Sequence, residues 1–212
     1  MWESLVVVTA LKAPAWHSDV MSPEAGNLSP SAILPVTPER LEDLERFSRS
    51  HGTFRYCSCQ RWRMTSSEFR TSTKEERVGR LSGAVAGGIP IGVLAYQDDL
   101  PIGWCSIAPR ETYLSLERSR VLPRIDDVPV WSVVCLYVAS AARGSGVAVA
   151  LLEGAVAYAC EAGAVAVEGY PVTADMNSYT HMGPLAVFER AGFVDVTPEG
   201  RTRRIVRRYC VE

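Results

Sequence analysis

The sequence predicts an α+β domain built on a mixed, largely antiparallel sheet with one parallel step and flanking helices. Two apolar runs, Ile91–Tyr96 and Ile102–Ile107, enclose a short polar turn and predict a β-hairpin. A third run, Val128–Val138, is rich in β-branched residues and predicts a longer strand. A small-residue helix over Gly144–Glu161 separates it from a further strand at Ala164–Glu168. Such a strand–helix–strand unit makes its two strands parallel.

The other elements follow from capping residues and apolar spacing. A helix is expected to begin after Thr37, with a proline in its first position, and to include Leu41, Leu44 and Phe47 at helical spacing. A second helical region is expected over Ser66–Ala86, where Val78, Leu81 and Val85 form an apolar stripe. The remaining predictions are a short helix over Arg110–Leu122, a helix over His181–Ala191, and strands over Phe193–Val196 and Arg203–Cys210.

Composition and charge indicate one globular domain. The chain has 212 residues, of which 47% are hydrophobic, and a formal net charge of −2. Residues 1–31 are predicted to form a poorly ordered extension, because Pro, Ser, Gly and Asn dominate 13–33, and residues 32–212 to form the domain. The charge gives no general attraction to nucleic acid or membranes. Arginines 201, 203, 204, 207 and 208 are interpreted as protection of a terminal edge strand.

Cysteine usage and the N-terminus favour a cytoplasmic protein. The apolar run Trp2–Leu11 has no positive charge before it and so does not resemble a secretory signal. Most of the 6 cysteines, Cys105, Cys135 and Cys160 among them, lie in apolar runs and are expected to be reduced and buried. Cys57 and Cys59 form a single Cys-x-Cys pair in a chain with 3 histidines, so no metal site is expected.

The segment Arg143-Gly144-Ser145-Gly146 predicts an anion site. It joins a strand to a fresh helix N-terminus, where several backbone N–H groups lack partners and point the same way. Glycine lets a phosphate approach the backbone closely. A dinucleotide fingerprint would need a third glycine where Val149 stands, and a Walker loop would need a lysine. Neither is present, which leaves another phosphate-bearing ligand.

The same residues resemble the GNAT superfamily of N-acetyltransferases. Arg143–Ala148 matches the pattern Arg/Gln-x-x-Gly-x-Gly/Ala, and Phe188–Phe193 is similar to the late helix-to-strand motif of that family. The resemblance runs from about Ala32 to the C-terminus. It implies direct transfer of an acetyl group from acetyl-CoA to a primary amine of a small molecule or peptide, without a metal. The residues that it implies for acetyl-CoA are Leu136, Tyr137, Val138, Arg143, Gly144, Ser145, Gly146, Val147, Ala148 and Asn177.

The resemblance is weaker at the expected acid and base. Phe188 stands where the family often has a proton-donating tyrosine, and Ser132 stands where some members have a glutamate base. Glu168 and Tyr170 follow at the end of the parallel strand, where they share a face and could act as base and acid. Tyr179 and His181 are further candidates. A backbone N–H near the strand end, that of Val138, is expected to bind the thioester carbonyl oxygen.

The acceptor pocket is predicted to include Cys57, Arg61, Trp104 and Trp131. Aromatic lining of this kind favours a small or amphipathic amine. The alternative function is a CoA-binding sensor or interaction module that has lost transfer activity, because Phe188 cannot donate a proton. The sequence is compatible with a monomer or a homodimer.

Overall fold

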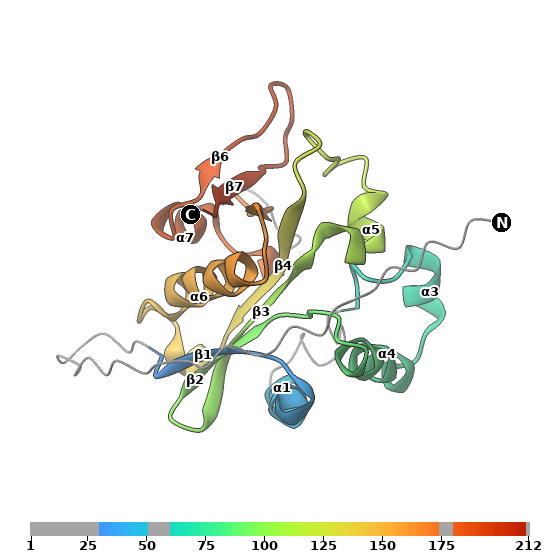
Figure 1. Cartoon of the computed structure of the whole chain (residues 1–212), viewed down its shortest axis with the longest axis vertical. Coiled ribbons are helices and arrows are strands. Elements are labelled where there is room, and N and C mark those ends of the chain that lie inside the picture. The colour runs from blue at the N-terminus through green and yellow to red at the C-terminus, as the bar shows by residue number, and fades with distance from the viewer. Residues whose placement is uncertain (1–29, 51–59, 174–179, 211–212) are drawn as a thin grey trace.

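The computed structural model describes residues 30–50, 60–173 and 180–210, which form a seven-stranded mixed sheet in the order β1-β2-β3-β4-β5-β7-β6 (Figure 1). Within these residues β4 and β5 are the one parallel pair, and every other neighbouring pair is antiparallel. The predicted fold class is confirmed. The strands are β1 (Ala32–Pro35), β2 (Val93–Gln97), β3 (Leu100–Pro109), β4 (Val130–Val138), β5 (Ala166–Gly169), β6 (Val194–Asp195) and β7 (Val206–Tyr209).

The predicted strands are present, and β1 is an addition. The hairpin is β2–β3, and the parallel step joins β4 to β5 through α6 (Val147–Glu161). β1 pairs with β2 over four residues, from Ala32 opposite Tyr96 to Pro35 opposite Val93. Its sequence is too short to show a period, and it ends in proline, which is tolerated on an edge strand. The predicted extension, residues 1–31, lies almost wholly outside the described residues.

The region predicted as one helix over Ser66–Ala86 is two helices, α3 (Ser66–Thr71) and α4 (Lys74–Ala86). Each begins with a capping box in which a threonine side chain and a glutamate three residues later satisfy each other's backbone N–H. The pairs are Thr65 with Glu68 and Thr73 with Glu76. The second box starts a new helix just before the apolar stripe, and periodicity alone did not reveal it.

Helices cover both faces of the sheet (Figure 1). α6 and α7 (Leu185–Arg190) pack on one face, where Leu151, Ala155 and Phe188 are buried. α1 (Leu41–Ser50) and α4 pack on the other, where Phe47 and Leu81 are buried. A third cluster lies beneath α5 (Leu114–Glu117). Among the described residues, no helix combines the length and the apolar character needed to cross a bilayer.

A disulfide bond joins Cys160, at the end of α6, to Cys210, just after β7, with their Cα atoms 5.5 Å apart. The expectation that Cys160 is a reduced, buried thiol is therefore wrong. The two cysteines are 50 residues apart in sequence, and only the return of β7 alongside β5 brings them together. Cys105 and Cys135 are free thiols, and Cys57 and Cys59 lie outside the described residues.

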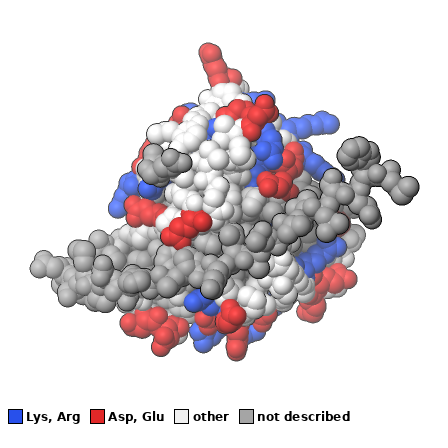
Figure 2. Space-filling model, viewed as in Figure 1, with Lys and Arg blue, Asp and Glu red and all other residues white. Residues whose placement is uncertain are grey.

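The interpretation of the C-terminal arginines as edge protection is also wrong for the strand that carries them. β7 lies between β5 and β6 and is not an edge strand. Arg203 and Arg207 are buried, with exposed fractions of 7% and 2%. Arg204 remains at the surface, paired with Asp195 at 2.9 Å. On the face shown in Figure 2, charges of both signs are interspersed over the described surface.

Candidate active site

The sheet opens where β4 and β5 part. The two strands pair only from Val130 opposite Ala166 to Val133 opposite Gly169, whereas β4 continues to Val138. Every β4 residue after Val133 lines a cavity of about 990 Å³. This is the topological irregularity of the sheet, where ligands bind in α/β folds. An unpaired stretch of strand edge is thus turned toward a cavity.

A β-bulge lies at the start of the opening. Ser106 faces Cys135 on β4, but the next β3 residue, Ile107, faces Val133, so Val134 is the extra residue. The bulge shifts the alternation of side chains by one position. Leu136 consequently packs with Val133 on the α6 side of the sheet, while Cys135 packs on the α1 side.

The backbone of Val138 is oriented toward the opening. The N–H of Ala139 donates to the carbonyl of Ile102 across the β3–β4 ladder at 2.9 Å. Successive residues of an antiparallel strand direct their N–H groups to opposite edges. The N–H of Val138 is therefore directed away from β3, to the edge that lines the cavity. The carbonyl of Val138 accepts a hydrogen bond from Arg143 Nε at 3.1 Å.

The glycine loop forms the N-terminus of α6. Gly144 and Gly146 have φ angles of +82° and +90°, which disfavour residues with a side chain. The earliest α6 amides that bond backward are those of Val149 and Ala150, which both donate to the carbonyl of Gly146. In the described part of the chain, no acceptor takes the N–H groups of residues 144–146, and the first helical N–H groups cannot bond within the helix. The donors predicted from the sequence are thus available.

Most residues predicted to bind the cofactor line this cavity. They are Leu136, Tyr137, Val138, Arg143, Gly144, Gly146, Val147 and Ala148. Ser145 lies in the loop but turns inward, where its hydroxyl donates to the carbonyl of Ala142 at 2.7 Å. Asn177 lies outside the described residues. No observation tests which of these residues bind a ligand, so the binding roles stay predictions.

The cavity also includes residues from the segment around α3 and α4. Arg61, predicted as an acceptor contact, lines it together with Phe69 and Arg77. Sequence reasoning missed the last two, because each reads as one position in an ordinary amphipathic helix. The guanidinium carbons of Arg61 and Arg77 lie 5.9 and 4.8 Å from the centre of the Phe69 ring. These cation–π contacts group two positive charges around one aromatic side chain.

The two predicted tryptophans do not line the cavity. Trp104 on β3 is fully buried in the cluster on the α1 side of the sheet. Trp131 on β4 is buried on the α6 side and makes an edge contact with Tyr158, at 5.6 Å between ring centres. Both positions belong to the core, because the strands that carry them are covered on both faces. Cys57 lies outside the described residues.

His181 is a titratable group at the cavity surface. It lies in a 3₁₀ turn, Thr180–Met182, that precedes α7. Burial lowers the pKa of His181 below its usual 6.5, and the positive charges of Arg203 and Arg61 lower it further. The imidazole is therefore neutral at neutral pH, the form that can accept a proton.

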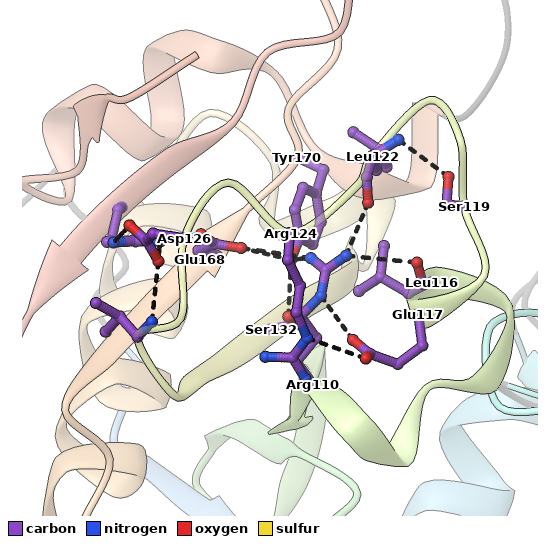
Figure 3. Close-up of polar contacts among 12 residues, drawn as sticks. Arg110, Leu116, Glu117, Ser119, Leu122, Arg124, Asp126, Ser132, Glu168 and Tyr170 are labelled. Carbon is purple, nitrogen blue, oxygen red and sulfur yellow. Dashed lines mark hydrogen bonds and ion pairs between the residues drawn. The ribbon is translucent and has the colours of Figure 1, made fainter. Parts of the chain in front are cut away.

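The predicted catalytic residues Ser132, Glu168 and Tyr170 come together, but in the interior (Figure 3). The Tyr170 hydroxyl lies 2.9 Å from Glu168 Oε2 and 2.8 Å from Ser132 Oγ. It also accepts a hydrogen bond from Arg110 Nη1 at 2.6 Å. None of the three side chains lines the cavity. The period-two alternation correctly placed Glu168 and Tyr170 on one face, while their catalytic role stays a prediction.

Two buried arginines compensate the charge of this network. Arg207 Nη2 lies 2.7 Å from Glu168 Oε1, and Arg110 Nη1 lies 3.4 Å from Glu168 Oε2. Arg207 also pairs with Asp126 at 2.7 Å, and Arg110 with Glu117 at 2.8 Å. Burial, followed by the negative charge of Glu168, raises the pKa of Tyr170 far above its usual value. A phenol of this kind holds its proton tightly.

Phe188 occupies a core position. Its ring is fully buried on α7 and packs edge-on against Phe193, 5.2 Å between ring centres. A Cβ added to Gly169, at the end of β5, would meet the Phe188 ring at 2.2 Å. The ring thus fills the space that the glycine leaves, and this side chain supplies no proton.

Comparison with known proteins identifies the family. Residues 56–193 match the model of the acetyltransferase (GNAT) family, which covers the sheet opening and the glycine loop. The chain belongs to this family. Its members' general chemistry is acetyl transfer, in agreement with the resemblance seen in the sequence. A search of curated proteins found no match.

Several solved structures are similar to this chain at low sequence identity. An agmatine N-acetyltransferase variant in its apo form superposes with a TM-score of 0.54 at 13% identity, covering 84% of this chain and 99% of that one. PaiA N-acetyltransferase from Thermoplasma acidophilum, in complex with coenzyme A, gives 0.49 at 15% identity, covering 84% and 98%. Ribosomal-protein-alanine N-acetyltransferase from Brucella melitensis gives 0.48 at 17% identity, covering 84% and 99%.

Proposed function

We propose that this protein is an acetyl-CoA-dependent N-acetyltransferase that transfers the acetyl group directly to a primary amine of a small molecule. The observation that carries the proposal is the meeting of two features in one cavity. These are the free edge of β4 after Val133 and the glycine loop at the start of α6. The first suits an extended amide chain, and the second suits phosphates.

The residues present fit acetyl-CoA. The amide groups of a pantetheine arm match the unpaired backbone of β4 at Leu136 and Val138, as an added strand would. A pyrophosphate matches the N–H groups of the loop from Gly144 onward, and Arg143 adds a positive charge there. When bound, acetyl-CoA supplies an acetyl group activated as a thioester.

The protein's own groups then serve the transfer. In the proposal, His181 takes a proton from the acceptor ammonium, so that the amine nitrogen can form the new C–N bond as the C–S bond breaks. The N–H of Val138 stabilises the negative charge that develops on the carbonyl oxygen. Phe188 donates no proton, so the departing thiolate takes its proton from solvent.

A second function, a CoA-binding module without transfer activity, is favoured by the burial of Phe188 in the core. One experiment separates the two. Acetyl-CoA affinity is measured by calorimetry, and release of CoA thiol is followed over a panel of primary amines, with mass spectrometry of the products. Binding with amine-dependent thiol release supports the enzyme. Binding without transfer to any amine supports the module, and absence of binding contradicts both.

A further inference from the structure

The charge of the cavity is one-sided. Of the described residues that line it, four are arginines, namely Arg61, Arg77, Arg143 and Arg190, and none is an aspartate or a glutamate. A cationic acceptor such as a polyamine would meet only positive charge among these described residues. Concentrated charge of one sign attracts ligands of the opposite sign.

The four arginines fall into two groups by their place in the fold. Arg143 belongs to the glycine loop, and Arg190 lies on α7, the helix that packs against α6. Arg143 lies next to the helix N-terminus that the proposed function gives to phosphates, and Arg190 reaches the cavity from α7. Arg61 and Arg77 belong to the separate segment around α3 and α4, with Phe69 between them. This second pair has no part in the proposed binding of acetyl-CoA.

Arg77 is held in place by hydrogen bonds through one end of its guanidinium, and its other N–H groups have no partner among the described residues. Its Nη1 donates to the carbonyls of Phe69 and Ser72 at 3.3 and 3.0 Å and lies 3.3 Å from the Ser72 hydroxyl. Its Nε is buried and has no hydrogen-bond partner. A buried donor without an acceptor is costly, and a guanidinium binds a carboxylate through two parallel N–H groups. The Nη2 group of Arg77 donates to no acceptor among the described residues, so the anchored guanidinium has a donor available for a ligand.

Arg61 adds a second cation without a counter-ion. Within the described residues it forms no ion pair, and its guanidinium rests against the rings of Trp62 and Phe69. In the core, the buried side chains of Arg110 and Arg207 are each matched by carboxylates. Arg61 and Arg77 have no such carboxylate among the described residues, and a ligand in the cavity can supply one.

We infer that the acceptor is a small amine that also carries a carboxylate, as amino acids do, and that Arg61 and Arg77 bind this carboxylate. The inference rests on the proposed acetyl transfer and specifies its substrate class. The carboxylate is held at the α3–α4 end of the cavity, which leaves the amine to face the β4 edge where the thioester is placed.

The test compares acceptors that differ only in the carboxylate. The full chain with acetyl-CoA is assayed with L-amino acids, their carboxamides and the corresponding decarboxylated amines, and with spermidine as a polycation. We expect kcat/KM for the preferred amino acid to exceed that for its amide and its decarboxylated amine by at least about tenfold, the effect of one charge-assisted hydrogen bond. Efficient acetylation of the decarboxylated amines or spermidine would overturn the inference but leave the proposed function intact. If acetyl-CoA binds but no amine on the panel causes thiol release, both the inference and the proposed function are overturned.

Variants assign the effect to the two side chains. Arg61→Gln removes a guanidinium with no hydrogen bond in the described structure, so folding is expected to be preserved. It should raise KM for the amino acid about tenfold and leave KM for the decarboxylated amine and acetyl-CoA affinity unchanged. The loss of a positive charge near His181 should shift the acidic limb of the pH profile equally for both acceptors. Arg77→Lys keeps the charge but loses the paired donors and should show a smaller rise. Arg70→Gln, an exposed position on α3, is the matched control. Equal losses for both acceptors would contradict a role in binding the carboxylate.

Discussion

The molecule contains two groups of arginines, one in the core and one in the cavity, and they differ in how their charge is compensated. Arg110 and Arg207 lie in the core, and each reaches Glu168 and one further carboxylate. Arg61 and Arg77 lie at the cavity and reach no carboxylate among the described residues. A charge removed from water requires a partner. The core therefore contains arginines paired with carboxylates, whereas the cavity contains arginines that have no carboxylate partner among the described residues.

This difference separates structural from ligand-binding roles. The core network joins β5 to β7 through Glu168 and Arg207, and joins β5 to the segment after β3 through Arg110. It fixes β5, one of the two strands whose divergence makes the opening. The cavity arginines fix no strands, and their positive charge is directed to a ligand.

The largest effect is expected for Glu168→Gln. The substitution leaves Arg110 and Arg207 buried without their shared carboxylate, and breaking a buried pair costs about 3–5 kcal/mol. The free energy of unfolding, measured by urea denaturation, should fall by that amount. Asp195→Asn, which breaks the exposed pair with Arg204, is the control and should cost under about 1 kcal/mol. A variant of unchanged stability with abolished turnover would instead support the catalytic role predicted for Glu168.

The second effect concerns the pH dependence of His181→Gln. The pKa of His181 is lowered, so its neutral form predominates at neutral pH and is lost as the pH falls through that value. If the imidazole is the base, kcat/KM of the wild type declines below a pKa lower than 6.5. In the variant this decline should be absent, and kcat/KM should be about 100-fold lower than in the wild type. An unchanged acidic limb would exclude His181 as the base.

Arg143→Glu tests the loop end of the cavity. The substitution replaces a positive charge next to the glycine loop by a negative one, so acetyl-CoA affinity should fall at least about tenfold in a calorimetric titration. Arg118→Glu, exposed and outside the cavity lining, makes the same change of charge and should leave affinity unchanged. Equal affinities of the two variants would contradict the phosphate assignment of the loop.

The sequence determined the order of elements well, because hydrophobic periods and glycine turns are local signals. The hairpin β2–β3, the parallel step and the glycine loop were all predicted. What it missed depends on distant residues meeting in space. The pairing of Glu168 with Arg207 and the disulfide between Cys160 and Cys210 both require β7 to lie beside β5. The bulge at Val134 likewise leaves no mark in an apolar run.

The same limit explains the site residues. The position of Glu168 and Tyr170 at a strand end correctly predicted that they lie together. It did not predict that β7 and the segment after β3 enclose them. Arg77 and Phe69 could not be recognised, since their function depends on the cavity that β4 opens. Two capping boxes, at Thr65 and Thr73, were readable signals that would have separated α3 from α4.

The smallest effect, and the sharpest test of the comparison, is expected for Tyr170→Phe. The hydroxyl contacts Arg110, Ser132 and Glu168 but does not line the cavity. Its removal should lower the free energy of unfolding by about 1–2 kcal/mol, the cost of unmet hydrogen bonds in the interior. Acetyl-CoA affinity and the pH profile of kcat/KM should stay unchanged, since a phenol whose pKa is raised by burial and by Glu168 is a poor proton donor.

The alternative outcome of that experiment is equally informative. If Tyr170 were the acid that protonates the departing thiolate, Tyr170→Phe would lower kcat without lowering stability, and the basic limb of the pH profile would disappear. Ser132→Ala distinguishes the cases further, because it removes one contact of the hydroxyl and leaves the phenol in place. A structural network predicts that both variants lose stability and keep turnover. A catalytic network predicts that the phenylalanine variant alone loses turnover, in which case the core and the cavity would form one functional unit.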